Sequence, residues 1–304
     1  MLKIHPVNDN PDIARRTRER LAISRERAAA LGRTAVEAIR TGSYETDDGS
    51  RVDWGENVRA AVEAKVSIPP DERIPAGAVP HAKEREESEE REAGEERDTV
   101  TDIYVVNDTT LAATRSLVDG GRTPLALNFA NGVHPGGGFL HGARAQEEAL
   151  CRSSALYATL EGDAMYTHHR ARAVPDSNDW AILSPSVPVF RTDWGTALPE
   201  PWSAHFITCA APVAAAVGVD RSAELLQQRI HRVLAIARAF RYTALVLGAW
   251  GCGAFGNDPL RTARDFRAAL EHAFEGAFDT VIFAISDWSP ERRFLGPFAE
   301  VFGR

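Results

Sequence analysis

The sequence predicts an α/β protein in which helices cover a sheet of buried strands, with a helical extension before it. From residue 101 onward, short apolar runs typical of buried strands alternate with segments of helical period. Two of these runs lead through a glycine-rich loop into a helix. With 304 residues and 44% hydrophobic content, the chain is long enough for one large domain and an extension.

Residues 1–68 are expected to form the N-terminal helical extension. Residues 12–40 repeat apolar side chains every three to four positions, which predicts one amphipathic helix with Asp12 as its N-cap. A short strand over residues 51–54 and a second helix over residues 56–65 follow. We expect these elements to cover part of the main domain, with the Arg-rich face of the first helix in solvent.

Residues 69–98 are predicted to be a linker. Their first half is punctuated by proline, and residues 83–98 are almost wholly charged. Burial of so few apolar side chains cannot offset the conformational entropy lost on ordering. We therefore expect the charged run to be exposed. The main domain is therefore expected to span residues 99–304.

The main domain is predicted to alternate strands and helices. The expected strands cover residues 103–106, 125–130, 181–184, 205–209, 244–248 and 281–285. The expected helices cover residues 108–118, 143–160 and 226–237. A final helix is expected to begin with Asp258 as N-cap and Pro259 at its first position.

The first glycine-rich loop follows the strand over residues 125–130. Gly136, Gly137 and Gly138 allow positive φ and a close approach of a ligand to backbone N–H groups, as in an anion-binding nest. Gln146, Glu147 and Glu148 then fall near the start of a helix that points at this loop. Taken singly, such glycines are ordinary turns and such glutamates ordinary first-turn residues. Their combination places two carboxylates beside an expected diphosphate site.

The second glycine-rich loop, G-C-G-A-F-G at residues 251–256, fits the dinucleotide-binding fingerprint G-x-G-x-x-G. A nicotinamide-dependent dehydrogenase is nevertheless disfavoured. Only about fifty residues remain after the loop, and Gly276 stands where that fingerprint expects an acidic residue for the ribose. Glycines between a strand and a helix N-terminus still suit a diphosphate, so two such loops would hold one ligand from both sides.

The run P-G-G-G-F-L-H-G-A-R-A-Q-E-E resembles the signature of the bacterial-type poly(ADP-ribose) glycohydrolases, which are macrodomain-fold enzymes. The run G-A-W-G-C-G-A-F-G-N-D at residues 248–258 resembles the second loop of that family. The resemblance covers the chain from about Thr101 to the C-terminus and is weaker before it. It implies a three-layer α/β/α macrodomain with a mixed central sheet.

The resemblance also implies roles for particular residues. Glu148 is expected to be the general acid/base, and Glu147 to orient the ribose hydroxyl groups. Asn131 is expected to hold the distal ribose, with Phe255 packed against that ribose. The residues expected to take the diphosphate are Gly136, Gly137, Gly138, Gly251, Cys252, Gly253, Ala254 and Gly256.

The activity implied is hydrolysis of the ribose–ribose O-glycosidic bond at the end of poly(ADP-ribose), without a metal or another cofactor. The expected partner is that polymer or an ADP-ribosylated protein. A reader that binds ADP-ribose without turnover and a hydrolase of another ADP-ribosyl conjugate remain alternatives. Both acids of Q-E-E favour an enzyme, because a reader needs the glycine loops but not two carboxylates.

Composition limits the remaining classes of function. A net charge of -8 disfavours direct nucleic-acid binding. No run approaches the roughly 18 apolar residues that span a membrane, and the N-terminus lacks the apolar core of a signal peptide, so we expect a cytoplasmic protein. Cys151, Cys209 and Cys252 form no C-x-x-C pattern and are expected to be reduced. The pair His168-His169 is expected to lie in a loop without binding metal.

Overall fold

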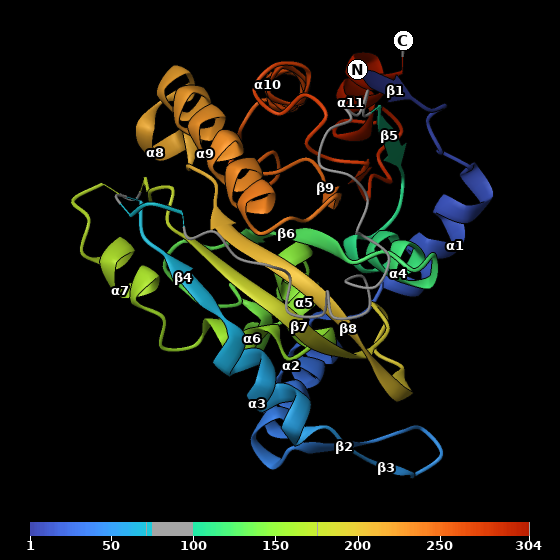
Figure 1. The fold of residues 1–304 in the computed structure, drawn as a ribbon. Helices are drawn as coiled ribbons and strands as arrows, with labels where there is room; N and C mark the ends of the chain where they lie inside the picture. The colour runs from blue at the N-terminus through green and yellow to red at the C-terminus, as the bar shows by residue number, and fades with distance from the viewer. Residues whose placement is uncertain (71, 75–99, 175, 304) are drawn as a thin grey trace, which may run out of the picture.

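The computed structural model describes residues 1–70, 72–74, 100–174 and 176–303. Its centre is an eight-stranded sheet that crosses the whole molecule (Figure 1). In spatial order the strands are β1 (Leu2–Ile4), β5 (Thr101–Val106), β10 (Thr280–Ala284), β9 (Ala244–Leu247), β6 (Pro124–Ala130), β8 (Ala197–Ala210), β7 (Ala181–Arg191) and β4 (Val66–Ile68). Only β7 runs against its neighbours among these strands, which confirms the predicted mixed sheet.

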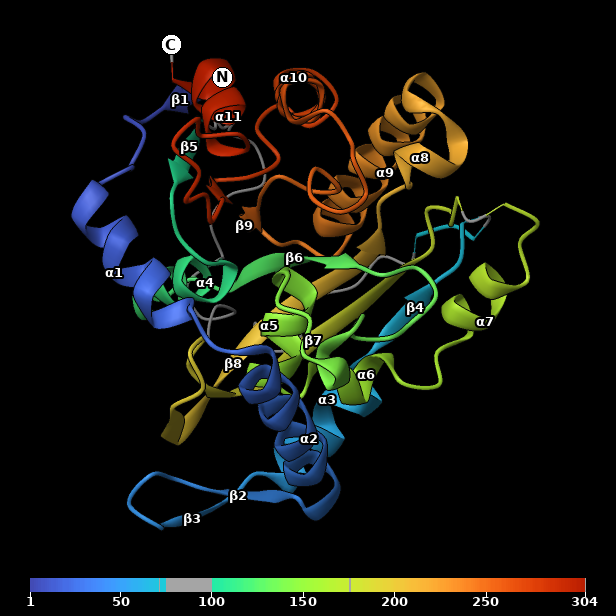
Figure 2. The same cartoon turned by 180° about the vertical axis from the view of Figure 1, so that it is seen from behind.

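Helices cover both faces of the sheet, as the two opposite views show (Figures 1 and 2). One face packs on α9 (Val219–Ala239), α10 (Pro259–Glu271) and α11 (Leu295–Phe302). The other packs on α2 (Arg25–Thr41), α3 (Gly55–Ala64), α4 (Thr110–Asp119), α5 (Gln146–Ser153) and α6 (Leu156–Leu160). The predicted three-layer architecture is therefore confirmed.

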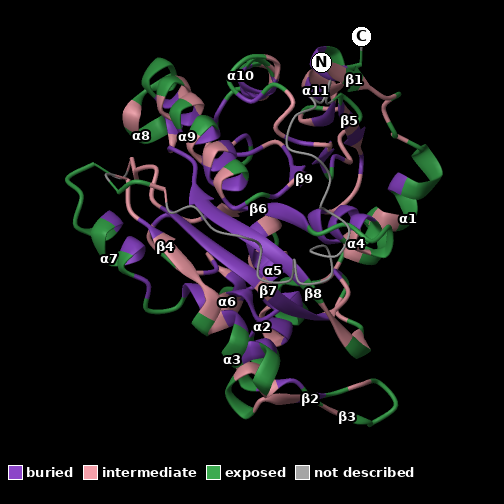
Figure 3. Ribbon diagram, in the orientation of Figure 1, coloured by how far each residue is buried: buried purple, intermediate pink, exposed green. Residues whose placement is uncertain are grey.

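The central strands are apolar on both sides because both faces are covered. Within β6, Leu125 and Leu127 belong to the core under α9 and α10, whereas Ala126 belongs to the core under α2 and α4. This alternation follows from the two-residue period of a strand. Figure 3 shows the resulting band of buried residues along the sheet.

The predicted long helix over residues 12–40 is wrong, because two helices form there. The first, α1 (Pro11–Leu21), is capped by Asn10 rather than Asp12, and the side chain of Asn10 accepts hydrogen bonds from the N–H groups of Asp12 and Ile13. The second, α2, begins where Ser24 accepts a hydrogen bond from the N–H of Arg27. A serine that caps a helix takes extended backbone angles, so it separates the two helices.

Both edge strands of the sheet come from the N-terminal 68 residues. β1 pairs in parallel with β5, and β4 pairs antiparallel with β7. Between them, β2 (Ser43–Glu45) and β3 (Arg51–Asp53) form a separate hairpin before α3. The sequence pattern predicts neither edge strand, because three residues carry too little periodicity. The division into an extension, a linker and a main domain stays a prediction, and most of that linker lies outside the described residues.

The predicted helix over residues 143–160 is also wrong, since it is divided into α5 and α6. Ser154 takes an extended conformation and bridges Val189 of β7. Its hydroxyl donates to the carbonyl oxygen of Leu150 and accepts from the N–H of Leu156. A serine side chain that bonds to nearby backbone in this way competes with helix continuation.

Several short helices escape the sequence pattern. They are the 3₁₀ helix η2 (Phe139–His141), α7 (Ala164–Arg170), α8 (Ala214–Val217) and α11. The start of α10 is as predicted, with the side chain of Asp258 accepting from the N–H of Arg261, but α11 rather than α10 is the last helix. Across the described residues, no helix is both long and apolar enough to cross a membrane.

Candidate active site

The first glycine-rich loop leaves the carboxyl end of β6 and leads through η2 into α5. Gly136 and Gly137 adopt left-handed angles, with φ of 72° and 58°. The predicted positive φ is therefore present at these two glycines, whereas Gly138 has a negative φ of -99°. Glu147 and Glu148 lie in the first turn of α5, as predicted.

Gly137 lies directly against the two carboxyl groups. A Cβ atom added here would lie 3.0 Å from Oε2 of Glu147 and closer still to Oε1 of Glu148. Only glycine combines this backbone conformation with this lack of space. The loop backbone and the two acids thus form one tightly packed unit.

Glu147 is almost fully buried, with 3% of its surface exposed. Its Oε2 accepts a hydrogen bond of 2.7 Å from the backbone N–H of Asn131, and its Oε1 lies 3.4 Å from Nδ2 of Asn128. Burial raises the pKa of the Glu147 carboxyl to about 8, against the hydrogen bond from Asn131, and the nearby charge of Glu148 raises it further. Glu147 therefore keeps its proton at neutral pH in this ligand-free form.

Glu148 presents one unused oxygen atom. Its Oε1 accepts a 3.0 Å hydrogen bond from the N–H of Gly138. Its Oε2 is buried and has no hydrogen-bond partner among the described residues. Because an unpaired buried carboxyl oxygen is costly, it marks the position where a ligand group or water would complete the site.

Gln146 holds the start of α5 to the end of β6. Its Oε1 accepts from the N–H of Phe129 at 2.9 Å, and its Nε2 donates to the carbonyl oxygen of Leu127 at 2.7 Å and to the hydroxyl of Thr110. The side chain thereby bonds to β6 as a neighbouring strand would. The motif singles out Gln146, but only the tertiary contacts reveal this supporting role.

Asn131, which is expected to hold the distal ribose, lies beside Glu147. Its side-chain oxygen accepts hydrogen bonds of 2.9 Å from the N–H groups of Val133 and His134, which closes a turn. Only its amide NH₂ group therefore remains for a ligand. Its backbone N–H is the group that holds Glu147.

The N-terminal segment supports this loop from the side of α2. Gly32 has no room for a side chain, because a Cβ there would lie 2.7 Å from the carbonyl oxygen of Phe139. Arg25 donates from Nε to the carbonyl oxygen of His141 at 3.0 Å. The sequence pattern does not predict this contact, since it joins residues more than 100 positions apart.

The second glycine-rich loop leaves the carboxyl end of β9, the strand that pairs in parallel with β6. Both loops therefore start from the same edge of the sheet, which is the usual ligand edge of an α/β protein. Gly251 and Gly256 have φ of 75° and 71°. Gly253, Ala254 and Gly256 are exposed, and the N–H of Gly256 donates a 3.1 Å hydrogen bond to the carbonyl oxygen of Gly253.

Two residues of the second loop have clear structural contacts. Phe255 is half-buried against the core, and its carbonyl oxygen accepts from the N–H of Ala214. Cys252 is buried with its sulfur 3.6 Å from the hydroxyl of Thr262, and burial raises its pKa to about 12. The side chain of Cys252 therefore packs inside the protein, which leaves only its backbone for a ligand.

Asn257 shapes the second loop although the sequence analysis gives it no role. Its Nδ2 donates to the carbonyl oxygens of Pro212 and Gly251, and its Oδ1 accepts from the hydroxyl of Ser222. All three contacts are 2.7 to 3.1 Å long. A polar side chain directly after the last glycine was the only signal available in the sequence.

The histidine pair does not lie in a loop, so that prediction is wrong. His168 and His169 lie on α7, where His169 is buried and bonds through its ring to the carbonyl oxygen of Gly132 and to Asn178. Within the described residues, no group of three or more His, Cys, Asp or Glu side chains could hold a metal ion. Cys151 is buried next to Glu147, and burial raises the pKa of its thiol well above the usual value.

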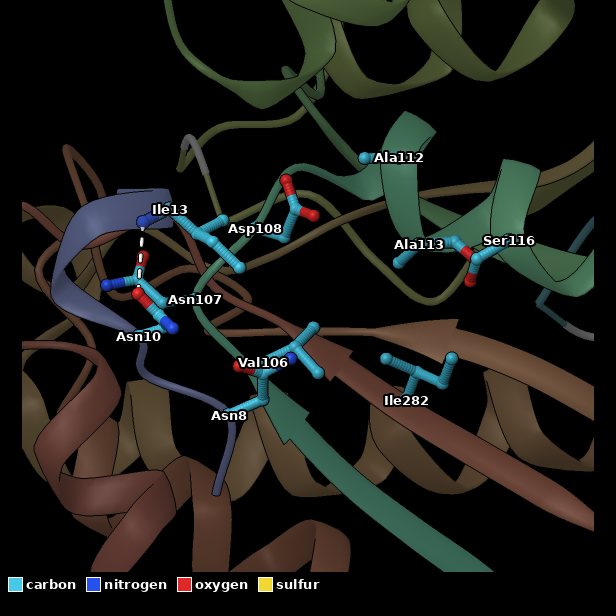
Figure 4. Close-up of a pocket in the computed structure, with 10 residues that line it drawn as sticks. All are labelled: Asn8, Asn10, Ile13, Val106, Asn107, Asp108, Ala112, Ala113, Ser116 and Ile282. Atoms are coloured by element: carbon cyan, nitrogen blue, oxygen red, sulfur yellow. Dashed lines mark hydrogen bonds between the residues drawn. The ribbon is translucent and has the colours of Figure 1, made fainter. Parts of the chain in front are cut away.

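A cavity of about 210 Å³ opens between α1, α4 and the end of β5 (Figure 4). Figure 4 shows the hydrogen bond from the N–H of Ile13 to the side chain of Asn10, with Asp108 and Ile282 among the other lining residues. None of the residues predicted for catalysis or diphosphate binding lines this cavity. The candidate active site is instead the unit of loop and helix around Glu147 and Glu148.

Residues 32–192 match the family model for the catalytic domain of microbial-type PARG, the poly(ADP-ribose) glycohydrolases. The chain belongs to this family. The match begins inside α2, so the family likeness starts well before Thr101, where the sequence motifs place it. As a member of the glycohydrolase family, the protein is a hydrolase with a macrodomain-like fold.

Solved structures of bacterial glycohydrolases are similar to most of the chain. The poly(ADP-ribose) glycohydrolase of Thermomonospora curvata is 38% identical, with a TM-score of 0.80, over 91% of this chain and 100% of that one. The same enzyme bound to the inhibitor ADP-HPD is 37% identical, with a TM-score of 0.78 and the same coverage. The Deinococcus radiodurans enzyme in complex with ADP-ribose is 34% identical, with a TM-score of 0.68, over 81% of this chain and 96% of that one. Among curated proteins, none matches.

Proposed function

We propose that this protein hydrolyses the ribose–ribose O-glycosidic bond at the end of poly(ADP-ribose) chains and releases ADP-ribose, with Glu148 as general acid/base. The observation that carries the proposal is the buried, unpaired Oε2 of Glu148 beside a glycine loop. The complexes of related enzymes with ADP-ribose and with ADP-HPD support a ligand of this class.

Cleavage of this bond needs a proton on the departing ribose oxygen and stabilisation of an oxocarbenium-like ribose. Glu148 suits the proton transfer, because one oxygen is fixed by the N–H of Gly138 and the other is unpaired. The same carboxylate then takes a proton from the attacking water, which makes it acid and base in turn.

Glu147 supports the reaction from a different position. Consecutive helix residues point about 100° apart, so the two carboxyl groups address different atoms of one sugar rather than flank it. Because the pKa of Glu147 is about 8, this side chain carries a proton at neutral pH. It can then donate a hydrogen bond to a ribose hydroxyl or accept one from it. A neutral Glu147 repels an anionic substrate less than a charged one would.

The diphosphate would be held by the backbone of the two glycine loops. With a net charge of -8, the chain is not a general anion-binding protein. Oriented N–H groups and the N-terminus of α5 bind phosphate without a cluster of basic side chains. Asn131 and Phe255 would both contact the distal ribose.

Chromatography of poly(ADP-ribose) after incubation with the protein tests the proposal. We expect free ADP-ribose to accumulate without added metal and in the presence of EDTA. If the protein binds ADP-ribose but leaves the polymer intact, it is a reader instead. If it cleaves only single ADP-ribose groups from proteins or another ADP-ribosyl conjugate, the bond assigned here is wrong.

A further inference from the structure

Arg152 is a buried cation in α5, one helical turn after Glu148. Only 4% of its surface is exposed. Its Nη1 donates a 2.7 Å hydrogen bond to the carbonyl oxygen of Ala143, while its Nε has no partner in the described part of the chain. Among the described residues, no carboxylate lies within the 4.0 Å of its guanidinium nitrogens that an ion pair requires. A buried charge without an ion pair is costly, so its presence calls for a functional reason.

Arg152 is connected to Glu148 by a short series of backbone hydrogen bonds. The carbonyl oxygen of Ala143 accepts from Arg152, and the N–H of Ala143 donates to the carbonyl oxygen of Gly138 at 3.1 Å. The N–H of Gly138 in turn donates to Oε1 of Glu148 at 3.0 Å. The turn of α5 between Glu148 and Arg152 closes this series into a ring.

The ring passes through a tightly packed part of the loop. A Cβ atom at Gly138 would lie 3.0 Å from Cβ of Ala143, so these two segments are in contact. Loss of the bond at Ala143 would therefore be transmitted to the N–H that holds Glu148. Burial lowers the pKa of Arg152, whereas the negative charges of Glu148 and Asp193 raise it. Arg152 therefore interacts electrostatically with both carboxyl groups.

We propose that Arg152 is a positioning residue for the glycohydrolase reaction: through Ala143 and Gly138 it fixes the Glu148 carboxylate, and it places a positive charge beside it. This inference rests on the proposed role of Glu148. It assigns no contact between Arg152 and the substrate, because the side chain points into the protein rather than into the loop.

The test compares three variants on poly(ADP-ribose). Arg152→Gln removes the charge, and Arg152→Lys keeps the charge but loses the planar group that reaches Ala143. Arg144→Gln is the matched control, because Arg144 is exposed in the same segment and, among the described residues, donates a hydrogen bond to the carbonyl oxygen of Ile23. For each variant, kcat and KM are measured on the polymer, and the Kd for ADP-ribose is measured by calorimetry.

Arg152→Gln is expected to lower kcat by about 10- to 100-fold, the size of effect that small misplacement of a reacting group produces. KM and the Kd for ADP-ribose should stay within about threefold. Arg152→Lys should lower kcat less, and Arg144→Gln should leave kcat and KM unchanged.

Two results would overturn the inference. One is an unchanged kcat in Arg152→Gln, which would mean that Arg152 does not act on Glu148. The other is a Kd for ADP-ribose that weakens in step with kcat, which would indicate a purely structural arginine. If Arg152→Gln does not fold, an unchanged kcat in Arg152→Lys would overturn the inference instead. Failure of the unmodified protein to release ADP-ribose would instead refute the proposed function and is visible in the same assay.

Discussion

At the scale of single residues, neighbouring carboxyl groups have different properties because their contacts differ. Glu147 accepts from the N–H of Asn131 and lies near Asn128, whereas Glu148 has one oxygen bound and one unpaired. Adjacent acids that differ in this way can divide proton transfer and orientation between them. Two substitutions separate these roles.

Glu148→Gln should remove most hydrolysis while the affinity for ADP-ribose stays within a few fold. The amide keeps the size and the hydrogen bond from Gly138 but cannot transfer a proton. General acid–base catalysis typically contributes about 10² to 10⁴ in rate. A polymer-degradation time course beside calorimetry with ADP-ribose measures both quantities. Near-native rates in this variant would place the acid elsewhere.

Glu147→Gln should make the protein less sensitive to pH between about 5 and 8. In the folded protein the pKa of Glu147 is about 8, which is above its ordinary value of 4.5. The protonated form of Glu147 therefore stabilises the folded state at low pH, and this contribution to the free energy of unfolding is lost as the pH rises toward 8. The free energy of unfolding should fall by about 2 to 4 kcal/mol over this range. This range follows from about 1.36 kcal/mol per pKa unit and allows for the coupling between Glu147 and Glu148.

Urea unfolding at pH 5 and pH 8 measures this difference. The variant should gain stability relative to the unmodified protein as the pH rises. Asp193, whose pKa is raised to about 6 by burial, is present in both proteins, so its contribution cancels in the difference between them. An equal stability difference at both pH values would mean that Glu147 is ionised throughout. Hydrolysis should also fall in this variant, together with a measurable loss of affinity, because the ribose is less well oriented.

At the scale of elements, the candidate active site is a loop packed between two helices. The loop after β6 packs on α5 through Gly137 and on α2 through Gly32, and neither glycine has room for a side chain. Close packing of this kind fixes the backbone N–H groups before the ligand arrives. The N-terminal segment is thus a structural part of the site rather than a distant addition.

Gly137→Ala should weaken ADP-ribose binding and abolish most activity. The new Cβ would displace both carboxyl groups, and the residue would also be strained at a φ of 58°. Gly121→Ala is the matched control, because Gly121 has a φ of 74° but open space around it. Both variants should lose about 1 kcal/mol of stability from backbone strain. Calorimetry with ADP-ribose distinguishes them, and equal affinities would contradict the packed arrangement.

At the scale of the whole molecule, the N-terminal 68 residues complete the sheet at both edges. β1 and β4 each bond to strands of the main domain, although the chain between them and β5 includes the predicted linker. The apolar residues of α2 and α3 share a core with α4 and α5. A main domain of residues 99–304 alone would expose this surface.

Cleavage at a protease site inserted within residues 75–99 should therefore leave the two fragments associated. The paired strands and the shared core should hold the two fragments together after the peptide bond is cut. The fragments should therefore elute together in gel filtration and keep ADP-ribose binding. The same site inserted in the chain but left uncut is the control. Separation of the fragments without denaturant would show that the extension is an independent unit.

The sequence alone determined the features that are local in the chain. The strand over residues 125–130, the glycine loop and the acids at the start of the next helix are confirmed because each depends on contiguous residues and regular spacing. The family signature lies in the same contiguous stretch. The mixed sheet followed from that resemblance, whereas the break at Ser154 did not, because its partner Val189 lies in a distant strand.

Only the tertiary structure decided how the site works. The raised pKa of Glu147 results from burial between β6 and the loop, and the bonds of Gln146 depend on where α5 docks. The contact of Gly32 with Phe139 and the edge strands β1 and β4 join segments about 100 residues or more apart. Periodicity describes which face of an element is apolar, but the partner of that face and the charge state of a buried acid are set by packing.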